Sequence, residues 1–360
     1  MNFTLHLTAD CNLRCRYCYE THSRAAMREE TALQAVDLAF SYGHEKNGFS
    51  LFGGEPMLKR ALIERIVRAA TERAGETGTS VSFKMTTNGT LLDEPFIRFA
   101  TGHGLMIALS HDGLQQDAQR VTRDGRPTRE TLEPVIDALL LHQPNAVAMQ
   151  TVTPETVGGM AESVQWLYER GFSRINTAID YRPDAAWDDG SMAVLKEQYA
   201  RVADLCEAHY DDARPLIYLN FASKISAYLN NRPCMECKLG MRQPSVAPDG
   251  KIYPCNQFLN LAAYCIGDVE HGVDTNRQRA IYRMSLDPEP ACEGCAIADR
   301  CRHHCACLNF SLTGHMHEVA PVQCEHERIL IPIADGLAAR LYERKSARFL
   351  KLYGDMLPED

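Results

Sequence analysis

Three closely spaced cysteines, Cys11, Cys15 and Cys18, lie near the start of the sequence. Three residues separate the first two, and two separate the last two. Thiols at this spacing fit three kinds of site: a zinc site completed by His6 or His22, a redox pair with a spare cysteine, or three corners of an iron–sulfur cluster. Structural zinc takes four ligands, whereas a cluster with three thiolates leaves one iron open to a substrate or cofactor. The triplet alone therefore favours a cluster over zinc.

A second group of cysteines lies late in the chain. Ten of the fourteen cysteines fall between Cys234 and Cys324, and Cys206 stands alone. A helical Cys206 is predicted to be a small buried hydrophobe, and Cys265 and Cys307 are predicted to be spare thiols. The other eight match two four-cysteine clusters or two zinc sites, namely Cys234, Cys237, Cys255, Cys292, Cys295, Cys301, Cys305 and Cys324.

Composition limits the class of protein. The 360 residues are 45% hydrophobic and 24% charged, which predicts a globular protein with one large domain and a smaller one. The net charge of −9 is spread along the chain, so no nucleic-acid or anionic membrane surface is predicted. The chain shows no export signal and no apolar run of membrane length, which predicts a cytoplasmic protein and argues against a disulfide framework.

Strand and helix patterns alternate through the first two hundred residues. Six short strands are predicted from residue periodicity at 3–7, 49–52, 81–86, 105–110, 146–152 and 174–179. Amphipathic helices are predicted between or after them at 61–73, 129–142, 155–169 and 191–210. This order predicts a parallel α/β sheet with crossover helices, either open or closed into a barrel.

Polar and glycine residues follow several of these strands. They lie at Gly53–Pro56, Thr87–Gly89 and Ser110–Gly113, and the cysteine triplet follows the first strand. Ligands bind at the carboxyl ends of the strands in both open α/β sheets and barrels. The sequence therefore predicts one ligand site on this rim.

The same residues resemble the radical S-adenosylmethionine (SAM) family. The triplet, with Tyr17 before its last cysteine, resembles the family's cluster motif. Gly53–Pro56 resembles the family's contact to the methionine amino group, and Ser110–Gly113 resembles its contact to ribose or carboxylate. Arg120 stands where the family has a carboxylate-binding arginine. The resemblance implies a partial (β/α)6 TIM-like barrel and a [4Fe-4S] cluster on Cys11, Cys15 and Cys18. The implied SAM contacts are Tyr17, Gly53, Gly54, Glu55, Asn88, Ser110 and Arg120.

The cysteine-rich remainder begins with a predicted hairpin. Asp249-Gly250 between two short alternating runs is a strong hairpin signal, and the hairpin would bring Cys255 back toward the first late pair. The region resembles the SPASM extension of radical SAM enzymes, which carries two auxiliary [4Fe-4S] clusters. The resemblance implies one cluster on Cys234, Cys237, Cys255 and Cys305 and another on Cys292, Cys295, Cys301 and Cys324. The predicted domains are a partial barrel at 1–211, a connector helix at 212–233, the SPASM domain at 234–327 and a C-terminal helix at 328–360.

The resemblance also implies an activity. Such enzymes cleave SAM to a 5′-deoxyadenosyl radical, which takes a hydrogen atom from an unactivated carbon, and SPASM members commonly modify peptides or proteins. Anaerobic sulfatase maturases have an aspartate, their proposed base, directly after the hairpin cysteine, whereas this chain has Asn256. Because an amide is no base near neutral pH, the preferred prediction is an intrapeptide crosslink, a Cys thioether of the sactipeptide or ranthipeptide kind.

Alternatives and partners complete these expectations. Formylglycine formation by a sulfatase-maturase-like reaction is the second prediction, and a non-catalytic zinc-binding module is the third. The implied partners are a ribosomally made precursor peptide and a reductant such as flavodoxin or ferredoxin. Since the chain begins almost at its first strand, we expect the barrel, the cap or a separate leader-binding protein to hold any leader.

Overall fold

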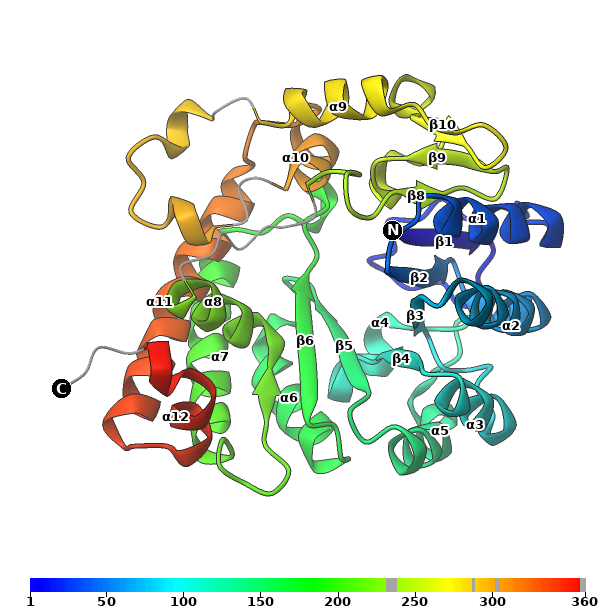
Figure 1. Cartoon of the computed structure of the whole chain (residues 1–360). Coiled ribbons are helices and arrows are strands. Elements are labelled where there is room, and N and C mark those ends of the chain that lie inside the picture. The colour runs from blue at the N-terminus through cyan, green and yellow to red at the C-terminus, as the bar shows by residue number, and fades with distance from the viewer. Residues whose placement is uncertain (231–237, 287–288, 302–304, 357–360) are drawn as a thin grey trace.

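The computed structural model of the chain describes residues 1–230, 238–286, 289–301 and 305–356. Their strands form one sheet in the order β11-β10-β9-β8-β1-β2-β3-β4-β5-β6-β7. The helices α1, α2, α3, α5, α6 and α7 lie along the outer side of the curved parallel part (Figure 1). No helix among these residues is both long and apolar enough to cross a membrane.

The parallel part contains the six predicted strands. Its strands pair in chain order and in parallel, namely β1 (Asn2–Thr8), β2 (Lys46–Gly53), β3 (Ser80–Thr87), β4 (Leu105–Ser110), β5 (Val147–Val152), β6 (Arg174–Ile179) and the short β7 (Ile217–Tyr218). The apolar side chains of β1 that alternate in the sequence, Phe3, Leu5 and Leu7, are fully buried, as the periodicity predicts. The α/β class is confirmed, and the sheet of the described residues stays open between β11 and β7.

Helices connect the parallel strands, as expected for crossover units. They are α1 (Glu29–Ser41), α2 (Arg60–Thr77), α3 (Glu94–Gly102), α4 (Gln116–Gln119), α5 (Arg129–His142), α6 (Met160–Glu169) and α7 (Asp189–Ala208), with α8 (Leu219–Leu229) after β7. The prediction for α5 matches both ends. Helix α6 begins later than predicted, because a 3-10 turn at Val157–Gly159 precedes it. The sequence analysis missed α1 and α3.

The late part of the chain extends the same sheet. Strand β8 (Ser245–Val246) pairs in parallel with β1, and β9 (Lys251–Tyr253), β10 (Gly267–Asp268) and β11 (Gly272–Val273) continue antiparallel. The predicted hairpin is confirmed: Gly250 has φ +87°, and its N–H donates to the carbonyl of Ala247 over 2.9 Å. Helices α9 (Thr275–Met284) and α10 (Ala306–Thr313) lie in the same part of the molecule (Figure 1).

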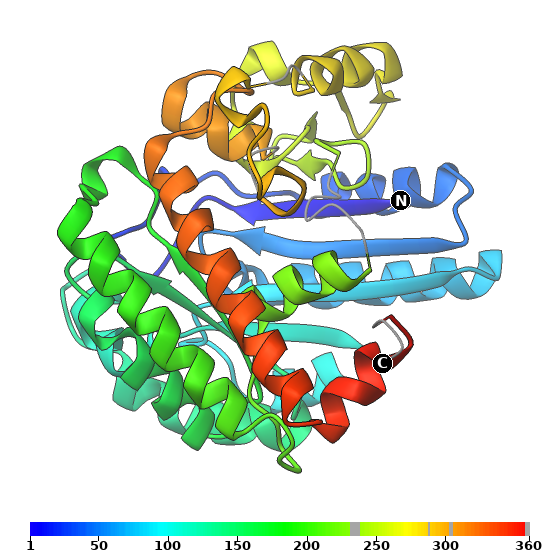
Figure 2. The ribbon, with the colours of Figure 1, turned by 90° about the vertical axis from the view of Figure 1, so that its left-hand side faces the viewer.

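The C-terminal prediction of one helix is wrong. Helix α11 (Pro321–Glu343) begins earlier, with a proline in its first turn, and α12 (Ala347–Tyr353) is a separate helix. Lys345 has φ +55° between them, and the Ser346 side chain caps α12, so the chain turns there. Figure 2 shows α11 running from the cysteine-rich part down the side of the parallel part, where it packs on α7 and α8.

Candidate functional site

A cavity of about 620 Å³ lies at the carboxyl ends of the parallel strands. It is the rim that the sequence analysis predicted to bind a ligand. All ten residues predicted for the cluster and for SAM line it, namely Cys11, Cys15, Cys18, Tyr17, Gly53, Gly54, Glu55, Asn88, Ser110 and Arg120. Five separate segments of the chain therefore converge on one cavity. No single motif predicts this convergence by itself.

The three thiols are free and largely shielded from water. Cys11 accepts from the Leu13 N–H over 3.4 Å and from Asn88 Nδ2 over 3.8 Å. Burial raises the pKa of Cys11 to about 12 and also raises the pKa values of Cys15 and Cys18. Thiolates in such a place require positive charge beside them, and iron supplies it. The donor set therefore fits a thiolate-bound cluster.

The zinc alternative has less support among the described residues. The His22 Nε2 atom lies 3.4 Å from the Cys18 sulfur, whereas His6 Nε2 lies 3.2 Å from the Glu20 carboxylate. Only His22 is therefore placed as a nitrogen ligand beside the triplet.

The glycines after β2 allow a close backbone approach. The Gly54 N–H donates to the Thr8 carbonyl over 2.8 Å, and the Glu55 N–H donates to the Asp10 carbonyl over 2.9 Å. A Cβ atom on Gly53 would lie 2.3 Å from the Thr8 oxygen, and Gly53 has φ +136°. Only glycine tolerates this geometry, so the segment is held directly against the loop that carries the cysteines.

Glu55 accepts hydrogen bonds from the chain itself. One carboxylate oxygen accepts from the Met57 N–H and from the Thr87 hydroxyl, over 2.9 and 2.6 Å, and the other accepts from the Asn88 N–H over 2.8 Å. Burial raises the pKa of Glu55, while these three bonds favour the charged form. Glu55 thus joins the ends of β2 and β3 and positions Asn88 at the cavity.

Asp112 organises the opposite wall. Its Oδ2 atom accepts from the Tyr17 hydroxyl over 2.6 Å and from Arg120 Nε over 3.0 Å, and its Oδ1 atom accepts from the Thr151 N–H over 2.8 Å. The guanidinium of Arg120 lies 5.2 Å from the centre of the Tyr17 ring. Burial alone would lower the pKa of Arg120, but Asp112 beside it raises that pKa, so Arg120 stays a cation. The sequence analysis missed this role of Asp112, although it lies within the flagged Ser110–Gly113 segment.

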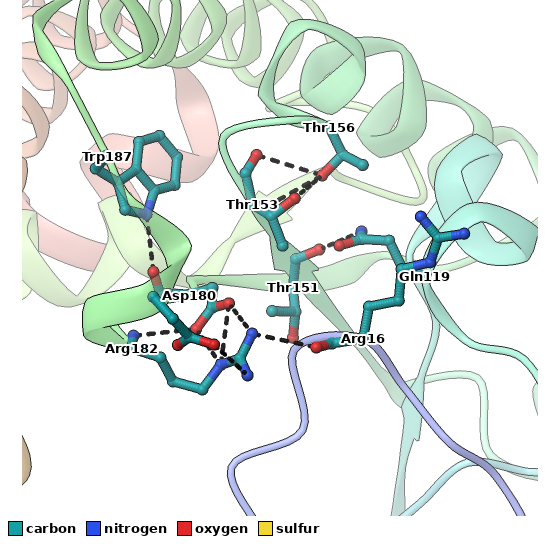
Figure 3. A network of polar contacts seen from close by, with 9 residues as sticks. Arg16, Gln119, Thr151, Thr153, Thr156, Asp180, Arg182 and Trp187 are labelled. Carbon is teal, nitrogen blue, oxygen red and sulfur yellow. Dashed lines mark hydrogen bonds and ion pairs between the residues drawn. The ribbon is translucent and has the colours of Figure 1, made fainter.

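The loop after β6 contributes residues that sequence reasoning missed. Asp180, Tyr181, Arg182 and Pro183 line the cavity. Figure 3 shows Arg182 between the Asp180 carboxylate, which it contacts over 2.8 Å, and the carbonyl of Arg16, to which it donates over 3.2 Å. The loop is thereby tied to the backbone beside the cysteine triplet. The sequence did carry a signal for this loop. Asp180 directly follows a predicted strand, and ligands bind at the carboxyl ends of such strands.

The cysteine-rich part closes the cavity from another side. Gln257, Leu308, Ser311 and Leu312 line it, the last three from α10. The Asn256 amide beside them donates to the Tyr19 hydroxyl over 3.1 Å, and its oxygen accepts from the Cys255 thiol over 3.1 Å. Asn256 therefore lies close to the cavity with both ends of its amide bonded.

The late cysteines gather in two places. The Cys305 and Cys307 sulfurs are 3.6 Å apart, and a hydrogen bond from Cys307 lowers the pKa of Cys255, so these three lie together. Burial, Glu289 and the nearby Cys324 and Cys295 raise the pKa of Cys292. Cys301 is buried, while Cys234 and Cys237 lie outside the described residues. The assignment of eight ligands to two clusters stays a prediction.

The three cysteines set aside by the sequence analysis differ in their surroundings. Cys206 is buried in the core on α7, as predicted, and burial raises its pKa to about 12. The Cys265 thiol donates to the Gly267 carbonyl over 3.3 Å. Cys307 lies beside Cys305 and Cys255, close to the predicted cluster ligands as its sequence position indicated.

Comparison with known proteins identifies the family. Residues 5–179 match the Radical SAM superfamily, and the match contains the triplet and every predicted SAM contact. The chain carries a radical SAM domain over residues 5–179. The family implies a [4Fe-4S] cluster and S-adenosylmethionine, which fit the free thiols and the cavity described above.

Two curated relatives match along most of the chain. A serine-type anaerobic sulfatase-maturating enzyme of Klebsiella aerogenes is 26% identical over 322 residues, covering 82% of this chain and 76% of the relative. A PqqA peptide cyclase of Xanthomonas oryzae pv. oryzae is 25% identical over 350 residues, covering 90% of this chain and 87% of the relative. Both alignments extend well beyond residues 5–179.

Solved structures share the fold. The structure of native anSMEcpe with bound AdoMet and the Kp18Cys peptide aligns with a TM-score of 0.80 at 17% identity, over 93% of this chain and 99% of that chain. SuiB of Streptococcus suis bound to the precursor peptide SuiA aligns with a TM-score of 0.62 at 15% identity, over 90% of this chain and 75% of that chain. The α/β radical SAM fold is thereby confirmed.

Proposed function

We propose that this enzyme is a peptide maturase that forms an intrapeptide crosslink, a thioether between a cysteine sulfur and a carbon of another residue. The observation that carries the proposal is the shared cavity, which the cysteine triplet, the strand ends and helix α10 of the cysteine-rich part all line. Relatives named as sulfatase-maturating enzymes and peptide cyclases support a peptide or protein substrate.

The residues at the strand ends would hold the cofactors. Cys11, Cys15 and Cys18 would bind a [4Fe-4S] cluster, and SAM would complete its open iron and supply a 5′-deoxyadenosyl radical when the cluster is reduced. Arg120 is a cation at the cavity and would pair with the SAM carboxylate, because only its Nε atom has a hydrogen-bond partner among the described residues. Tyr17, Asn88, Ser110 and the Gly53–Glu55 segment would complete the site.

The cysteine-rich part would be a SPASM domain over 234–327 with two further [4Fe-4S] clusters. They would take up the electron that the substrate gives away when the new bond forms. The proposed ligand sets are Cys234, Cys237, Cys255 and Cys305 for the first cluster and Cys292, Cys295, Cys301 and Cys324 for the second. Because Cys307 touches Cys305, it is a candidate ligand of the first cluster as well.

The proposed partners follow from this chemistry. A ribosomally made precursor peptide would be the substrate, and a flavodoxin or ferredoxin would reduce the first cluster. A leader segment would bind to the barrel, the cysteine-rich cap or a separate protein. The absence of disulfides among the described cysteines suits work in the reducing cytoplasm.

Oxidation of Cys or Ser to formylglycine is a second candidate function. The 26% identity to the sulfatase-maturating enzyme of Klebsiella aerogenes favours it. Asn256 argues against it, because an amide with both ends hydrogen-bonded cannot take a proton near neutral pH. Both candidates need the same radical site, so products distinguish them.

Anaerobic reconstitution followed by mass spectrometry tests the proposal. After reconstitution with iron and sulfide, SAM and dithionite should yield 5′-deoxyadenosine, and replacement of Cys11, Cys15 and Cys18 by Ala should abolish it. Cys206→Ala is the control, because that thiol is buried in the core away from the cavity. Candidate peptides that contain cysteine but no serine should lose two hydrogens per modification and keep their sulfur. Loss of sulfur would indicate formylglycine, and a protein that holds only zinc would contradict both candidates.

A further inference from the structure

The loop that carries the cysteine triplet is paired with the chain at the end of α4. The N–H groups of Arg14 and Arg16 donate to backbone carbonyls there over 2.8 and 3.0 Å, and Leu13 forms a β-bridge with Thr122. Successive side chains of an extended backbone point to opposite faces. Leu13 is accordingly buried, whereas Arg14 and Arg16 are exposed. The two arginines that flank Cys15 therefore lie on the outer face of the loop.

The turn next to this loop adds two exposed arginines. Arg123 pairs with Asp10, and Arg126 pairs with Asp124 over 2.7 Å. Water surrounds both pairs, so each contributes little to stability. Four exposed arginines on the paired segments form what we call the basic face, namely Arg14, Arg16, Arg123 and Arg126.

The basic face differs in charge from the rest of the protein. Residues 10–24 and 119–129 contain seven arginines and three carboxylates, in a chain whose net charge is −9. Arg14 and Arg16 form no ion pair among the described residues, although Glu155 lies within electrostatic reach of Arg16. Charges of one sign that gather on one surface attract partners of the opposite sign. The face is therefore suited to a partner with an acidic surface.

The basic face lies on the other side of the cysteine loop from the substrate cavity. Cys11, Cys15 and Cys18 line the cavity, whereas none of the four arginines does. A peptide that reacts in the cavity has no need of this face, but an electron that reduces the cluster must reach the same three cysteines from outside. Complexes of electron-transfer proteins bury little surface, and attraction between their charges speeds the encounter. The position and charge of the face both fit such an encounter.

We propose that the basic face docks an acidic one-electron carrier, a flavodoxin, which reduces the cluster through this side of the loop. The inference deepens the proposed function and rests on it. The reduced flavin of the carrier gives up one electron, and the cluster on Cys11, Cys15 and Cys18 gains it. No covalent bond forms or breaks and no proton is transferred, so atoms and charge balance.

The experiment compares two reductants on the same reconstituted enzyme. Arg14→Glu/Arg16→Glu reverses both charges beside Cys15 and leaves the cavity lining unchanged. With reduced flavodoxin at about 50 mM salt, we expect kcat/KM for the carrier to fall at least about tenfold, because attraction becomes repulsion. Bleaching of the cluster absorbance on mixing with the carrier should slow equally. With saturating dithionite, 5′-deoxyadenosine should form at the wild-type rate, because dithionite needs no docking surface.

A matched variant and a salt series control for net charge. Arg279→Glu/Arg283→Glu makes the same change in charge on exposed positions of α9 and should keep the wild-type kinetics with flavodoxin. At about 500 mM salt the tenfold difference should shrink, since the screening length falls below about 5 Å. Equal iron content and melting temperature in all three proteins would show that folding and cluster loading are intact.

The outcomes separate this inference from the proposed function. Unchanged flavodoxin kinetics in Arg14→Glu/Arg16→Glu, or a wild type that accepts electrons from dithionite but not from flavodoxin, would overturn the inference alone. A peptide KM that rises in this variant with dithionite as reductant would place an acidic peptide on the basic face and would also overturn it. If the wild type forms no 5′-deoxyadenosine with dithionite, the proposed function is wrong and the inference falls with it.

Discussion

At the scale of single residues, many polar groups near the cavity hold the chain itself. Glu55 accepts three hydrogen bonds, from Met57, Thr87 and Asn88. Asp112 also accepts three, from Tyr17, Arg120 and Thr151. Buried polar groups of this kind cost free energy unless they are bonded. Their role is to place the ligand-binding residues. A motif read from the sequence does not show whether a polar residue binds the ligand or positions a neighbour that does.

His111, next to Asp112, predicts a pH dependence of stability. Its ring is fully buried, stacks on Trp166 and accepts from the Gly113 N–H over 2.9 Å, and burial lowers its pKa from 6.5 to about 3. The unfolded chain therefore binds more protons than the folded chain between these pH values. This contribution to stability is complete above about pH 6.5 and is lost as pH falls.

The test compares the wild type with His111→Phe by urea unfolding at pH 7.5 and pH 5.5. The wild type should lose about 1.4 kcal/mol more than the variant over this interval, because only its histidine must be kept neutral. His111→Phe should also be less stable at pH 7.5, since the Gly113 N–H loses its acceptor. Equal pH dependence of the two proteins would show that His111 is not the responsible group.

At the scale of elements, a buried ion pair joins α8 to α11. The Lys224 ammonium lies 2.5 Å from the Glu327 carboxylate, and both side chains are only 1% exposed. Lys224 also donates to the carbonyl of Arg300 over 3.0 Å, and Arg300 pairs with Asp335 of α11. The loop that ends at Cys301 is thereby held between the two helices.

Breaking this pair should be costly. Glu327→Gln leaves the Lys224 charge buried without a counter-charge, so we expect the free energy of unfolding to fall by about 3–5 kcal/mol. Glu29→Gln removes the partner of Arg65 in an exposed pair and should change stability little. Urea unfolding of both variants measures the difference. The double variant Lys224→Met/Glu327→Leu should recover most of the loss, and a double variant as unstable as Glu327→Gln would contradict this account.

Sequence periodicity predicts elements well where burial is regular. The six parallel strands alternate or run apolar because helices and neighbouring strands cover them, so their positions follow from the sequence. The bounds of the C-terminal helices do not follow from periodicity. The break depends on the positive φ of Lys345 and the Ser346 cap, and α11 starts at a proline in its first turn. The hydrogen bond between Tyr181 and His326 could not be predicted from the sequence, since the two residues are 145 positions apart and lie on different elements, the loop after β6 and α11.

At the scale of the whole molecule, the two parts of the chain share one sheet and one cavity. Strand β8 pairs with β1 at Thr4 and Leu5, and Gln243 Nε2 donates to the Thr4 hydroxyl over 2.9 Å. Because β1 leads directly into the cysteine triplet, the late part is fixed close to it. Helix α10 can therefore contribute a wall of the cavity that the residues predicted to hold SAM also line.

A side chain on α10 should separate peptide binding from SAM cleavage. Ser311 is exposed and lines the cavity, and its hydroxyl donates only to the Leu308 carbonyl of its own helix, over 2.8 Å. Ser311→Trp adds bulk where a peptide would lie, so we expect the peptide KM to rise at least about tenfold, a cost of about 1.4 kcal/mol. Formation of 5′-deoxyadenosine without peptide should persist, because the strand-end residues are unchanged.

Leu141→Trp serves as the control for that experiment, since Leu141 is 75% exposed on α5 and does not line the cavity. Both variants should match the wild type in iron content and melting temperature. A peptide KM unchanged in Ser311→Trp would mean that the substrate enters without contacting α10. Loss of 5′-deoxyadenosine formation would instead place SAM against this helix, so the two results locate the peptide and the cofactor on opposite walls or on the same one.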